Sequence, residues 1–263
     1  MPKTLYRLLL GFGLDTRVLL RAIGASPGFV YAFWRYRRLN AHRNFAATFR
    51  DLHPVLHQRK AEAGTAAGHY FHQDLWAAQR IYSNRPGAHL DVGSRIDGFI
   101  AHLLVFMPVT VIDIRPLECF VPGLSFRRDD ATTLGGIPDD SVPSLSSLHV
   151  VEHFGLGRYA DSIDPDACFT FMRNLQRVLA PGGHLYFSAP IGRERLEFNA
   201  HRIFSQGTIA KAFEGLRLES FAYIADNGEL HETADPAALP HVEYGCGLFD
   251  FVKPLHPGVP TVS

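Results

Sequence analysis

The sequence predicts an α/β protein: a Rossmann-like, doubly wound sheet of seven strands with an antiparallel last strand, plus an N-terminal helical appendage. From residue 69 onward, apolar stretches of strand length alternate with stretches of helical periodicity. Strands separated by helices form parallel sheets. The last two apolar stretches, residues 216–224 and 242–252, have no helical pattern between them, so we expect them to pair antiparallel.

The composition indicates a folded chain with two parts of opposite charge. The 263 residues are 46% hydrophobic and 20% charged, which excludes a disordered or low-complexity protein. The 26 basic and 26 acidic residues balance, but residues 1–60 carry a net charge of +9 and the remainder −9. We expect a basic helical segment at 1–68 and an α/β domain at 69–263. The acidic domain argues against nucleic-acid binding through a broad basic face.

The cysteine pattern favours a reducing, cytoplasmic setting. Cys119, Cys168 and Cys246 are odd in number, far apart and without a CxxC motif, so we expect neither a disulfide framework nor a metal site. The first apolar run, residues 8–14, is too short to span a bilayer. It lacks a clear small-residue cleavage site, so we expect no signal peptide.

The basic segment reads as two helices. Asp15 can cap a helix over residues 16–23 that ends at Gly24, and Ser26-Pro27 can open a second that runs to about residue 39. The second helix interleaves aromatic side chains with arginines, namely Phe33 and Trp34 with Arg35, Arg37 and Arg38. Such a helix can lie on an anionic membrane surface or simply pack on the domain, and the sequence leaves both open.

The α/β domain is expected to begin with a helix over residues 69–82, stopped by residues 84–87. A helix placed before the first strand can fold across a cofactor cleft, and Tyr70, Gln73 and Trp76 are the side chains that could do so. The alternative is that these side chains belong to the core.

Residues 89–98 form the central motif, which reads as strand, tight turn and helix. Leu90 and Val92 can finish a buried strand, and Gly93 and Gly98 permit the turn. Such a turn directs backbone N–H groups at one point, which suits the polar end of a nucleotide-like cofactor. Twenty residues after Gly93, a second strand ends in Asp113, whose carboxylate can bind both hydroxyls of a ribose.

The remaining elements continue the alternation. Strands are expected at 124–127, 145–150 and 184–189, and helices at 167–179 and 205–213, with a sharp turn at 180–183. His149 lies within an apolar strand and is expected to be a hydrogen-bonded core residue.

Four of these features together resemble the class I S-adenosylmethionine-dependent methyltransferases over about residues 88–252. They are Asp91-Val-Gly93, Asp113, Asp130 after the third strand, and the turn Leu179-Ala-Pro-Gly-Gly183. Within that superfamily the chain resembles domain-of-unknown-function family 268, from about Tyr70 onward. The phrases that suggest it are Asp91-Val-Gly-Ser-Arg-Ile-Asp-Gly-Phe99, Leu148-His-Val-Val-Glu-His-Phe-Gly-Leu-Gly-Arg-Tyr159, Pro190-Ile-Gly192 and Phe198-Asn-Ala-His-Arg202.

The resemblance implies that S-adenosylmethionine is the cofactor and that it lies against the first three strand ends. The cofactor-binding residues it implies are Asp91, Gly93, Ser94, Arg95, Gly98, Asp113 and Asp130. The chain departs from the family pattern at Arg95, which stands where the second glycine is expected, and at Pro143, which stands where many relatives have an acid. Arg95 can pair with the cofactor carboxylate or block the pocket.

The loop after the fourth strand supplies the candidate catalytic residues. His153 is the expected general base, since imidazole has a pKa near neutrality, and Glu152 is an alternative base or orients a histidine. Both can instead merely hold the loop. Arg158 and Tyr159 are expected to position an anionic or sugar substrate. A second polar cluster that can contact substrate comprises Arg193, Asn199, His201 and Arg202.

Three functions remain open from the sequence. The first is O-methylation of a saccharide or other hydroxylated metabolite. The second is an NAD-type oxidoreductase, because Gly93, Arg95 and Gly98 fall on the positions of a Gly-x-Gly-x-x-Gly motif with the middle glycine lost. The third is a non-catalytic, methyltransferase-like binding protein, suggested by Arg95.

Overall fold

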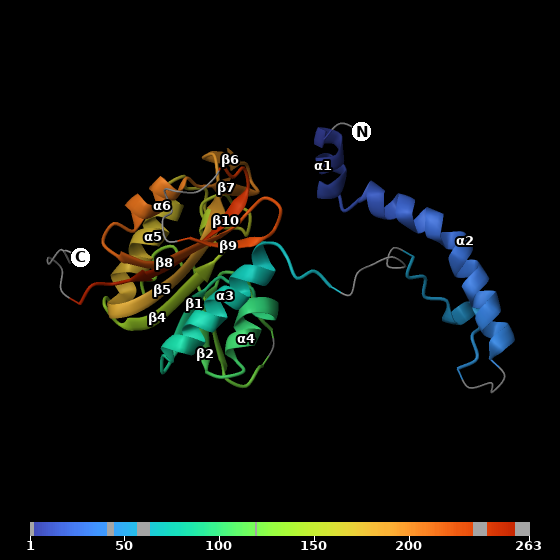
Figure 1. The fold of residues 1–263 in the computed structure, drawn as a ribbon, viewed down its shortest axis with the longest axis horizontal. Helices are drawn as coiled ribbons and strands as arrows, with labels where there is room; N and C mark the ends of the chain where they lie inside the picture. The colour runs from blue at the N-terminus through green and yellow to red at the C-terminus, as the bar shows by residue number, and fades with distance from the viewer. Residues whose placement is uncertain (1–2, 41–44, 57–63, 119, 234–240, 256–263) are drawn as a thin grey trace. The chain divides into compact units, whose positions relative to one another are not determined.

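The computed structural model describes residues 3–40, 45–56, 64–118, 120–233 and 241–255. The chain divides into two compact units, Met1–Thr65 and Ala66–Ser263 (Figure 1).

The first unit consists of helices, as expected. Its described residues form α1 (Lys3–Gly11), α2 (Thr16–Leu39) and a 3-10 turn at Phe49–Asp51. Asp15 caps α2 as expected, its carboxylate accepting from the backbone N–H groups of Arg17 and Val18. The expected break at Gly24 is wrong, because α2 continues through Pro27. The Ser26 hydroxyl donates to the Ala22 carbonyl within this stretch.

The second unit is built on a mostly parallel sheet with the strand order β3-β2-β1-β4-β5-β10-β8-β9. The first five of these run parallel, and β10 is antiparallel to both β5 and β8, which confirms the expected antiparallel pairing. The bounds are β1 His89–Val92, β2 Val109–Asp113, β3 Leu124–Arg128, β4 Val142–Leu148, β5 Leu179–Ile191, β8 Arg217–Ile224, β9 Leu230–Thr233 and β10 Gly245–Val252.

The sheet of the described residues has eight strands rather than the expected seven. The additional edge strand, β9, pairs antiparallel with β8. A separate hairpin joins β6 (Arg195–Glu197) to β7 (His201–Ile203). These three strands have only three or four residues each, too few for a period-two pattern to stand out in the sequence.

Helices cover both faces of the sheet, as Figure 1 shows. On one face lie α3 (His69–Asn84), a π-helical turn at Ile96–Ile100 and α4 (Ala101–Leu103), packed through Trp76 and Phe99. On the other lie α5 (Ala167–Val178) and α6 (Gln206–Ala212), packed through Phe171 and Phe213. This two-sided burial is what a doubly wound sheet requires.

Two strand boundaries, the end of β4 and the start of β5, differ from expectation. Strand β4 ends at Leu148, because His149 adopts a left-handed conformation with φ of 57° and leaves the strand direction. Strand β5 begins at Leu179, before the Pro-Gly-Gly turn rather than after it, and Gly182 takes the positive φ of 75° that the turn needs. The carboxyl ends of β1, β2, β3 and β4 thus meet at one edge, where doubly wound folds bind ligands.

Candidate functional site

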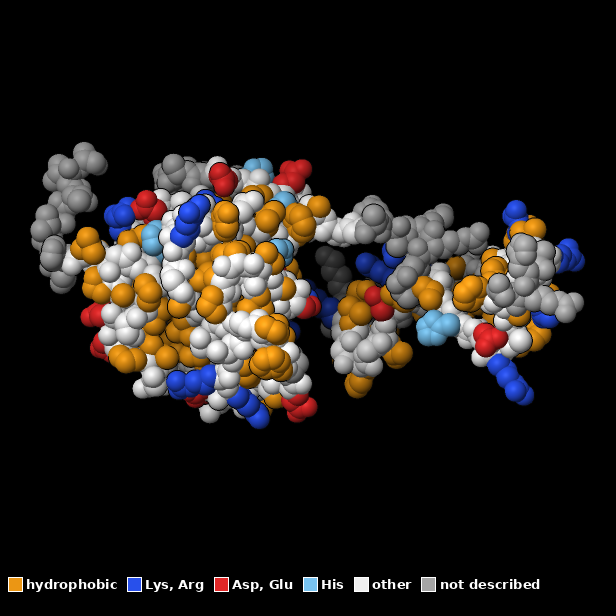
Figure 2. Space-filling model, turned by 90° about the horizontal axis from the view of Figure 1, so that it is seen from below, with side chains coloured by type: hydrophobic (Ala, Val, Ile, Leu, Met, Phe, Trp, Pro, Cys, Tyr) orange, Lys and Arg blue, Asp and Glu red, His pale blue; other side chains and the backbone are white. Residues whose placement is uncertain are grey.

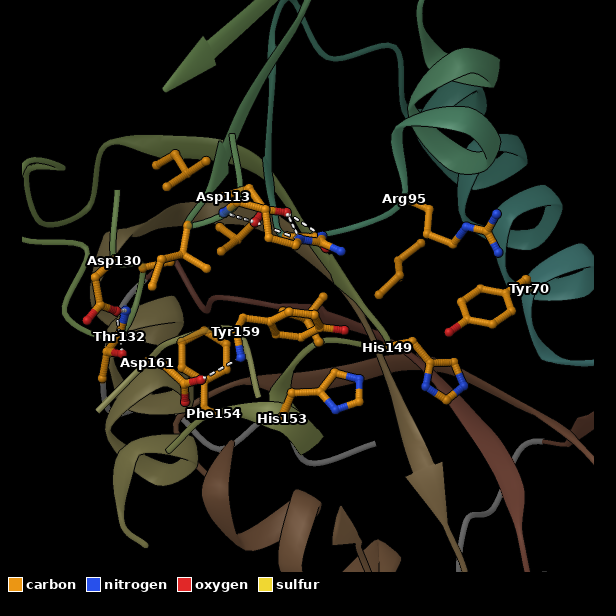
Figure 3. Close-up of a pocket in the computed structure, with 18 residues that line it drawn as sticks. Tyr70, Arg95, Asp113, Asp130, Thr132, His149, His153, Phe154, Tyr159 and Asp161 are labelled. Atoms are coloured by element: carbon orange, nitrogen blue, oxygen red, sulfur yellow. Dashed lines mark hydrogen bonds and ion pairs between the residues drawn. The ribbon is translucent and has the colours of Figure 1, made fainter. Parts of the chain in front are cut away.

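A cavity of about 230 Å³ lies at this edge. Its walls come from the ends of four neighbouring strands, from the start of α3 and from the loop that follows β4 (Figure 3). The lining residues are Tyr70, Val92, Gly93, Arg95, Ile112, Asp113, Ile114, Arg115, Asp130, Ala131, Thr132, Leu148, His149, Val150, His153, Phe154, Tyr159 and Asp161.

Gly93 makes the turn at the end of β1 possible. Its φ is 75°, and a Cβ atom there would stand 2.7 Å from Cγ1 of Val150, a clash. Glycine is therefore required both for the conformation and for the approach of the β4 loop. The backbone at this point stays open to the cavity, as a cofactor-binding turn requires.

Asp91 and Ser94 lie behind this turn rather than in the cavity wall. The Asp91 carboxylate is fully buried and accepts hydrogen bonds from the Ser94 backbone N–H and hydroxyl and from the Ser146 hydroxyl. Burial raises the pKa of Asp91 to about 6 despite these bonds. The Ser94 hydroxyl in turn accepts the Leu148 N–H. Both residues shape the turn and hold it against β4.

Gly98, also expected to bind the cofactor, does not line the cavity. A Cβ atom on Gly98 would stand 2.3 Å from Oδ2 of Asp74 on α3. Gly98 therefore allows the π-helical turn to pack closely against α3, which fixes the position of the Tyr70 side of the pocket.

Arg95 lies at the rim of the cavity and is bound by protein groups. Its guanidinium forms two hydrogen bonds with the Asp97 carboxylate, at 3.0 and 2.8 Å, and lies 4.9 Å from the centre of the Tyr70 ring. Figure 3 shows its charged end directed toward Tyr70 and away from Asp113. In this position Arg95 leaves the middle of the cavity open, and its half-exposed side chain remains able to turn toward a ligand.

Asp113 lies in the middle of the cavity wall, where its carboxylate is paired with Arg115. The Arg115 Nε donates to both carboxylate oxygens, at 2.9 and 3.1 Å, and the Arg115 backbone N–H donates to Oδ1 at 2.8 Å. The same guanidinium donates to the Gly93 carbonyl and lies 5.1 Å from the centre of the Tyr159 ring. Sequence reasoning missed Arg115, although its place two residues after the strand-terminal acid was visible.

Asp130 lies at the far end of the cavity from Arg95 (Figure 3). Its carboxylate accepts from the backbone N–H of Thr132 at 2.9 Å and from the Thr132 hydroxyl at 2.6 Å. This local turn exposes the backbone of residues 130–132 to the cavity. Gly93, Asp113 and Asp130 thus line one continuous cavity, in the order of their strands.

The loop after β4 brings a buried carboxylate between two imidazoles. Oε1 of Glu152 lies 2.6 Å from Nδ1 of His149 and 3.6 Å from Nε2 of His153. Burial opposes ionisation of Glu152, but His149 beside it brings the pKa of the carboxyl below its usual value. Burial likewise disfavours an imidazolium at His149, yet Cys246 and Glu152 raise the pKa of His149 well above its usual value.

His153 is held with one ring nitrogen toward the protein. Its Nδ1 lies 2.8 Å from the Ala200 carbonyl and 3.3 Å from Nη1 of Arg158, which donates to the same carbonyl. When Nδ1 donates its proton to this carbonyl, Nε2 has the lone pair. Burial lowers the pKa of His153, with Arg158 adding to the effect and Glu152 opposing it. A neutral imidazole with a free Nε2 is the form that a general base needs.

The other residues expected at the substrate side are partly in place. Tyr159 lines the cavity between the guanidinium groups of Arg115 and Arg158. Arg158 is exposed and donates to the Ala200 carbonyl. Outside the cavity lining lie Arg193, which is exposed, Asn199, His201, which contacts the Tyr244 ring, and Arg202, which donates to the Phe154 and Pro165 carbonyls.

The three residues of α3 that were expected to fold across the cofactor cleft lie in different places. Tyr70 lines the cavity and is 45% exposed, so it can contact a ligand. Gln73 and Trp76 are buried in the core. His149, expected in the core, is buried and hydrogen-bonded but also lines the cavity, because its left-handed backbone turns it out of the strand.

Comparison with known structures identifies the fold. The 1,6-didemethyltoxoflavin-N1-methyltransferase of Burkholderia thailandensis, solved with 1,6-didemethyltoxoflavin and S-adenosylhomocysteine, is 16% identical with a TM-score of 0.51; the match covers 69% of this chain and 79% of that one. A putative sarcosine dimethylglycine methyltransferase from Galdieria sulphuraria is 12% identical with a TM-score of 0.52, over 70% and 86% of the two chains. The α/β unit has the class I methyltransferase fold.

The structures that this chain resembles are named for different reactions. The (4+2)-cyclase SpnF matches equally well, at 14% identity and a TM-score of 0.52 over 70% of this chain and 82% of that one. Residues 140–234 match the family model described as "Caenorhabditis protein of unknown function, DUF268", which confirms the resemblance over β4 to β9. The comparison with curated proteins finds no match.

Proposed function

We propose that the protein is an S-adenosylmethionine-dependent methyltransferase that methylates a hydroxyl group of a saccharide or another hydroxylated metabolite. The observation that carries this proposal is the continuous cavity from Asp130 past Asp113 to Gly93, at the carboxyl edge of a methyltransferase fold. The three successive strand ends offer an adenine side, a ribose-binding acid and an open glycine turn.

The cavity residues fit this cofactor. The Gly93 turn presents backbone that no side chain of its own covers. The Asp113 carboxylate can accept hydrogen bonds from two ribose hydroxyls once the Arg115 guanidinium releases one or both carboxylate oxygens. Asp130 and the Thr132 backbone would face the adenine, and Arg95 can pair with a carboxylate by leaving Asp97. When bound, the cofactor supplies an electrophilic methyl group and its own leaving group.

The chain's own contribution to catalysis is to align the acceptor and take up its proton. An acceptor hydroxyl is a poor nucleophile until it loses its proton, and Nε2 of His153 has the lone pair for that proton. Glu152, 3.6 Å from Nε2, would stabilise the resulting imidazolium. The Tyr159 ring between two guanidinium groups would hold a sugar or anionic group beside the base.

The topology disfavours the oxidoreductase alternative. In a dinucleotide-binding fold all six strands are parallel in the order 3-2-1-4-5-6. Here the antiparallel β10 lies between β5 and β8. Calorimetry with S-adenosylmethionine, S-adenosylhomocysteine and NAD tests this directly, and we expect the first two to bind and NAD not to.

Methyl transfer is tested by incubation with S-adenosylmethionine carrying a labelled methyl group and a panel of saccharides and other hydroxylated metabolites. Label transferred to oxygen supports the proposal. Cofactor binding without transfer to any acceptor would favour the non-catalytic alternative, and NAD binding alone would overturn both.

For the first unit we propose peripheral contact with an anionic membrane. Among its described residues none on α2 is buried, and Leu19, Leu20, Ile23 and Trp34 are 47% or more exposed. Figure 2 shows hydrophobic side chains together with those of Lys and Arg on the surface of this unit. The Arg37 guanidinium lies 5.2 Å from the centre of the Trp34 ring, so charge and aromatic surface lie together. No described helix is long and apolar enough to cross a membrane. A basic helix with exposed apolar side chains suits the interface instead.

Vesicle sedimentation tests this contact. Vesicles with anionic lipid should sediment the protein at low salt, whereas high salt, or charge reversal at Arg35, Arg37 and Arg38, should release it. Replacement of Phe33 and Trp34 by Ser should weaken binding at every salt concentration, because these side chains insert into the apolar part of the membrane and do not contribute charge. Equal amounts in the supernatant with anionic and neutral vesicles would contradict the proposal.

A further inference from the structure

Three potential metal ligands meet beside the cavity, from three parts of the chain that are far apart in sequence. His69 begins α3, His149 follows β4 and Cys246 lies in β10. One ligand atom of each lies within 4.8 Å of the other two, and His69 Nδ1 is 3.0 Å from His149 Nε2. Tetrahedral zinc with two nitrogen ligands and one sulfur ligand places these atoms about 3.3–3.6 Å apart. Small side-chain shifts would therefore close the cluster around an ion.

The surroundings of the two imidazoles are those of metal ligands. Glu152 accepts from Nδ1 of His149 at 2.6 Å, which leaves Nε2, the nitrogen that faces His69, for an ion. The His69 ring also packs against the Tyr244 ring, with 5.3 Å between the ring centres, which limits the orientation of the imidazole. A carboxylate or carbonyl behind a histidine fixes its tautomer and orients its ligand nitrogen, the usual second layer of a metal site.

Charge and burial also favour a cation. Cys246 is fully buried, and its Sγ makes long contacts of 3.8 Å to Gln73 Oε1 and 3.7 Å to the Gly247 carbonyl. Oε2 of Glu152 is buried without a hydrogen-bond partner among the described residues. A Cys246 thiolate and the Glu152 carboxylate together balance the two positive charges of a divalent ion.

We propose that His69, His149 and Cys246 form a binding site for a divalent transition metal, with zinc as the best match to two imidazoles and a thiolate. Sequence spacing gave no sign of this site, because no two of the ligands share a short motif. Three protein ligands leave a fourth coordination position, as in catalytic zinc sites. His149 lines the cavity, so the ion would lie at the end of the pocket where His153 lies. The site does not depend on the proposed methyl transfer.

The test uses the full chain, stripped with a chelator and titrated with zinc alone in competition with a chromophoric chelator. We expect one ion per chain. Cys246→Ser and His69→Gln should each weaken zinc binding at least tenfold, whereas Cys168→Ser, at a buried free cysteine on α5, should leave it unchanged. Cobalt should give tetrahedral ligand-field bands and a thiolate charge-transfer band that Cys246→Ser abolishes.

Thermal unfolding of the metal-free variants shows whether each one is folded, so that a lost zinc site can be told from a lost fold. If Cys246→Ser unfolds, the cobalt spectrum of the wild type still decides, because a thiolate band requires a cysteine ligand and Cys168→Ser should retain it. Absence of stoichiometric zinc binding to the wild type, or binding that both cluster variants leave intact, would overturn the proposal. Calorimetry with S-adenosylhomocysteine on the metal-free protein shows separately whether cofactor binding stands.

Discussion

The two ends of the cavity hold their ionisable groups in different ways. On the side of the cavity that runs from Asp113 to Asp130, the Asp113 carboxylate is itself buried, but its partner Arg115 is 44% exposed and Asp130 is exposed. At the His149 end, the His149 and Glu152 side chains are 4% and 2% exposed, and Cys246 is fully buried. One end can exchange its partners with water and ligand, and the other cannot.

This difference in solvent exposure suggests that the two ends of the cavity have different roles. The Arg115 guanidinium is open to solvent and can leave Asp113 when a ligand hydroxyl takes its place, so the Asp113 end suits recognition of a ligand that comes and goes. Buried charges are costly to leave unpaired, so the Glu152 carboxylate holds the His149 imidazole, and the Ala200 carbonyl holds His153, each by its Nδ1. Fixed ring orientations and a low dielectric suit proton transfer or metal binding.

The largest effect is expected at the buried end. His153→Ala should lower kcat with the best acceptor of the panel about 100-fold or more, because general bases contribute about 10²–10⁴-fold. The dissociation constant of S-adenosylhomocysteine should stay the same. His231→Ala on β9, an exposed histidine outside the cavity, is the control and should retain the full rate. A rate retained by His153→Ala would remove the base from this end.

The next effect is expected at the exposed end. Asp113→Ala should weaken S-adenosylhomocysteine binding at least tenfold by calorimetry, because hydrogen bonds to a charged carboxylate contribute about 1.5–3 kcal/mol. The rate at saturating cofactor should change less than the affinity does, since Asp113 is expected to bind rather than react. Unchanged affinity in a folded variant would show that the ribose is bound elsewhere.

Arg115→Gln sharpens the same comparison. The guanidinium occupies both oxygens of Asp113, so a ligand hydroxyl competes with it. Its removal should tighten S-adenosylhomocysteine binding about two- to fivefold, because solvent around the 44% exposed guanidinium weakens its pair with the buried Asp113 carboxylate. Weaker binding would mean that Arg115 contacts the ligand itself, so that Asp113 and Arg115 both bind it.

The sequence predicted the exposed end better than the buried one, and the reason is chain distance. Gly93, Asp113 and Asp130 each follow a strand, and strand ends can be read locally from apolar runs and turn residues. Helix and strand alternation likewise predicted the sheet and its antiparallel β10, while strands of three or four residues escaped detection. Arg115 was overlooked, although its spacing from Asp113 was readable.

The buried end depends on tertiary placement. His69 lies 80 positions before His149, and Cys246 comes from a strand that the sheet order inserts beside β5. His149 looked like a core residue because its neighbours are apolar, and only its left-handed backbone turns it to the cavity. No local pattern contains that information.

A second imidazole–carboxylate pair, away from the cavity, gives the smallest expected effect. Nδ1 of His184 at the start of β5 lies 2.8 Å from Oδ1 of Asp250 on β10, and the His184 side chain is 26% exposed. The hydrogen bond to Asp250 raises the pKa of His184, with burial opposing it. Since the folded pKa is above the unfolded value, the pair stabilises the protein fully below pH 6.5 and loses that contribution as the pH rises through the folded pKa.

Urea unfolding of the wild type and His184→Gln at pH 6 and at pH 8 measures this contribution. The difference in the free energy of unfolding between the two proteins should be larger at pH 6, by about 0–1 kcal/mol for a partly exposed pair. Because the comparison is made at each pH, the titration of other groups cancels. A larger difference at pH 8 would mean that neutral His184 is the stabilising form.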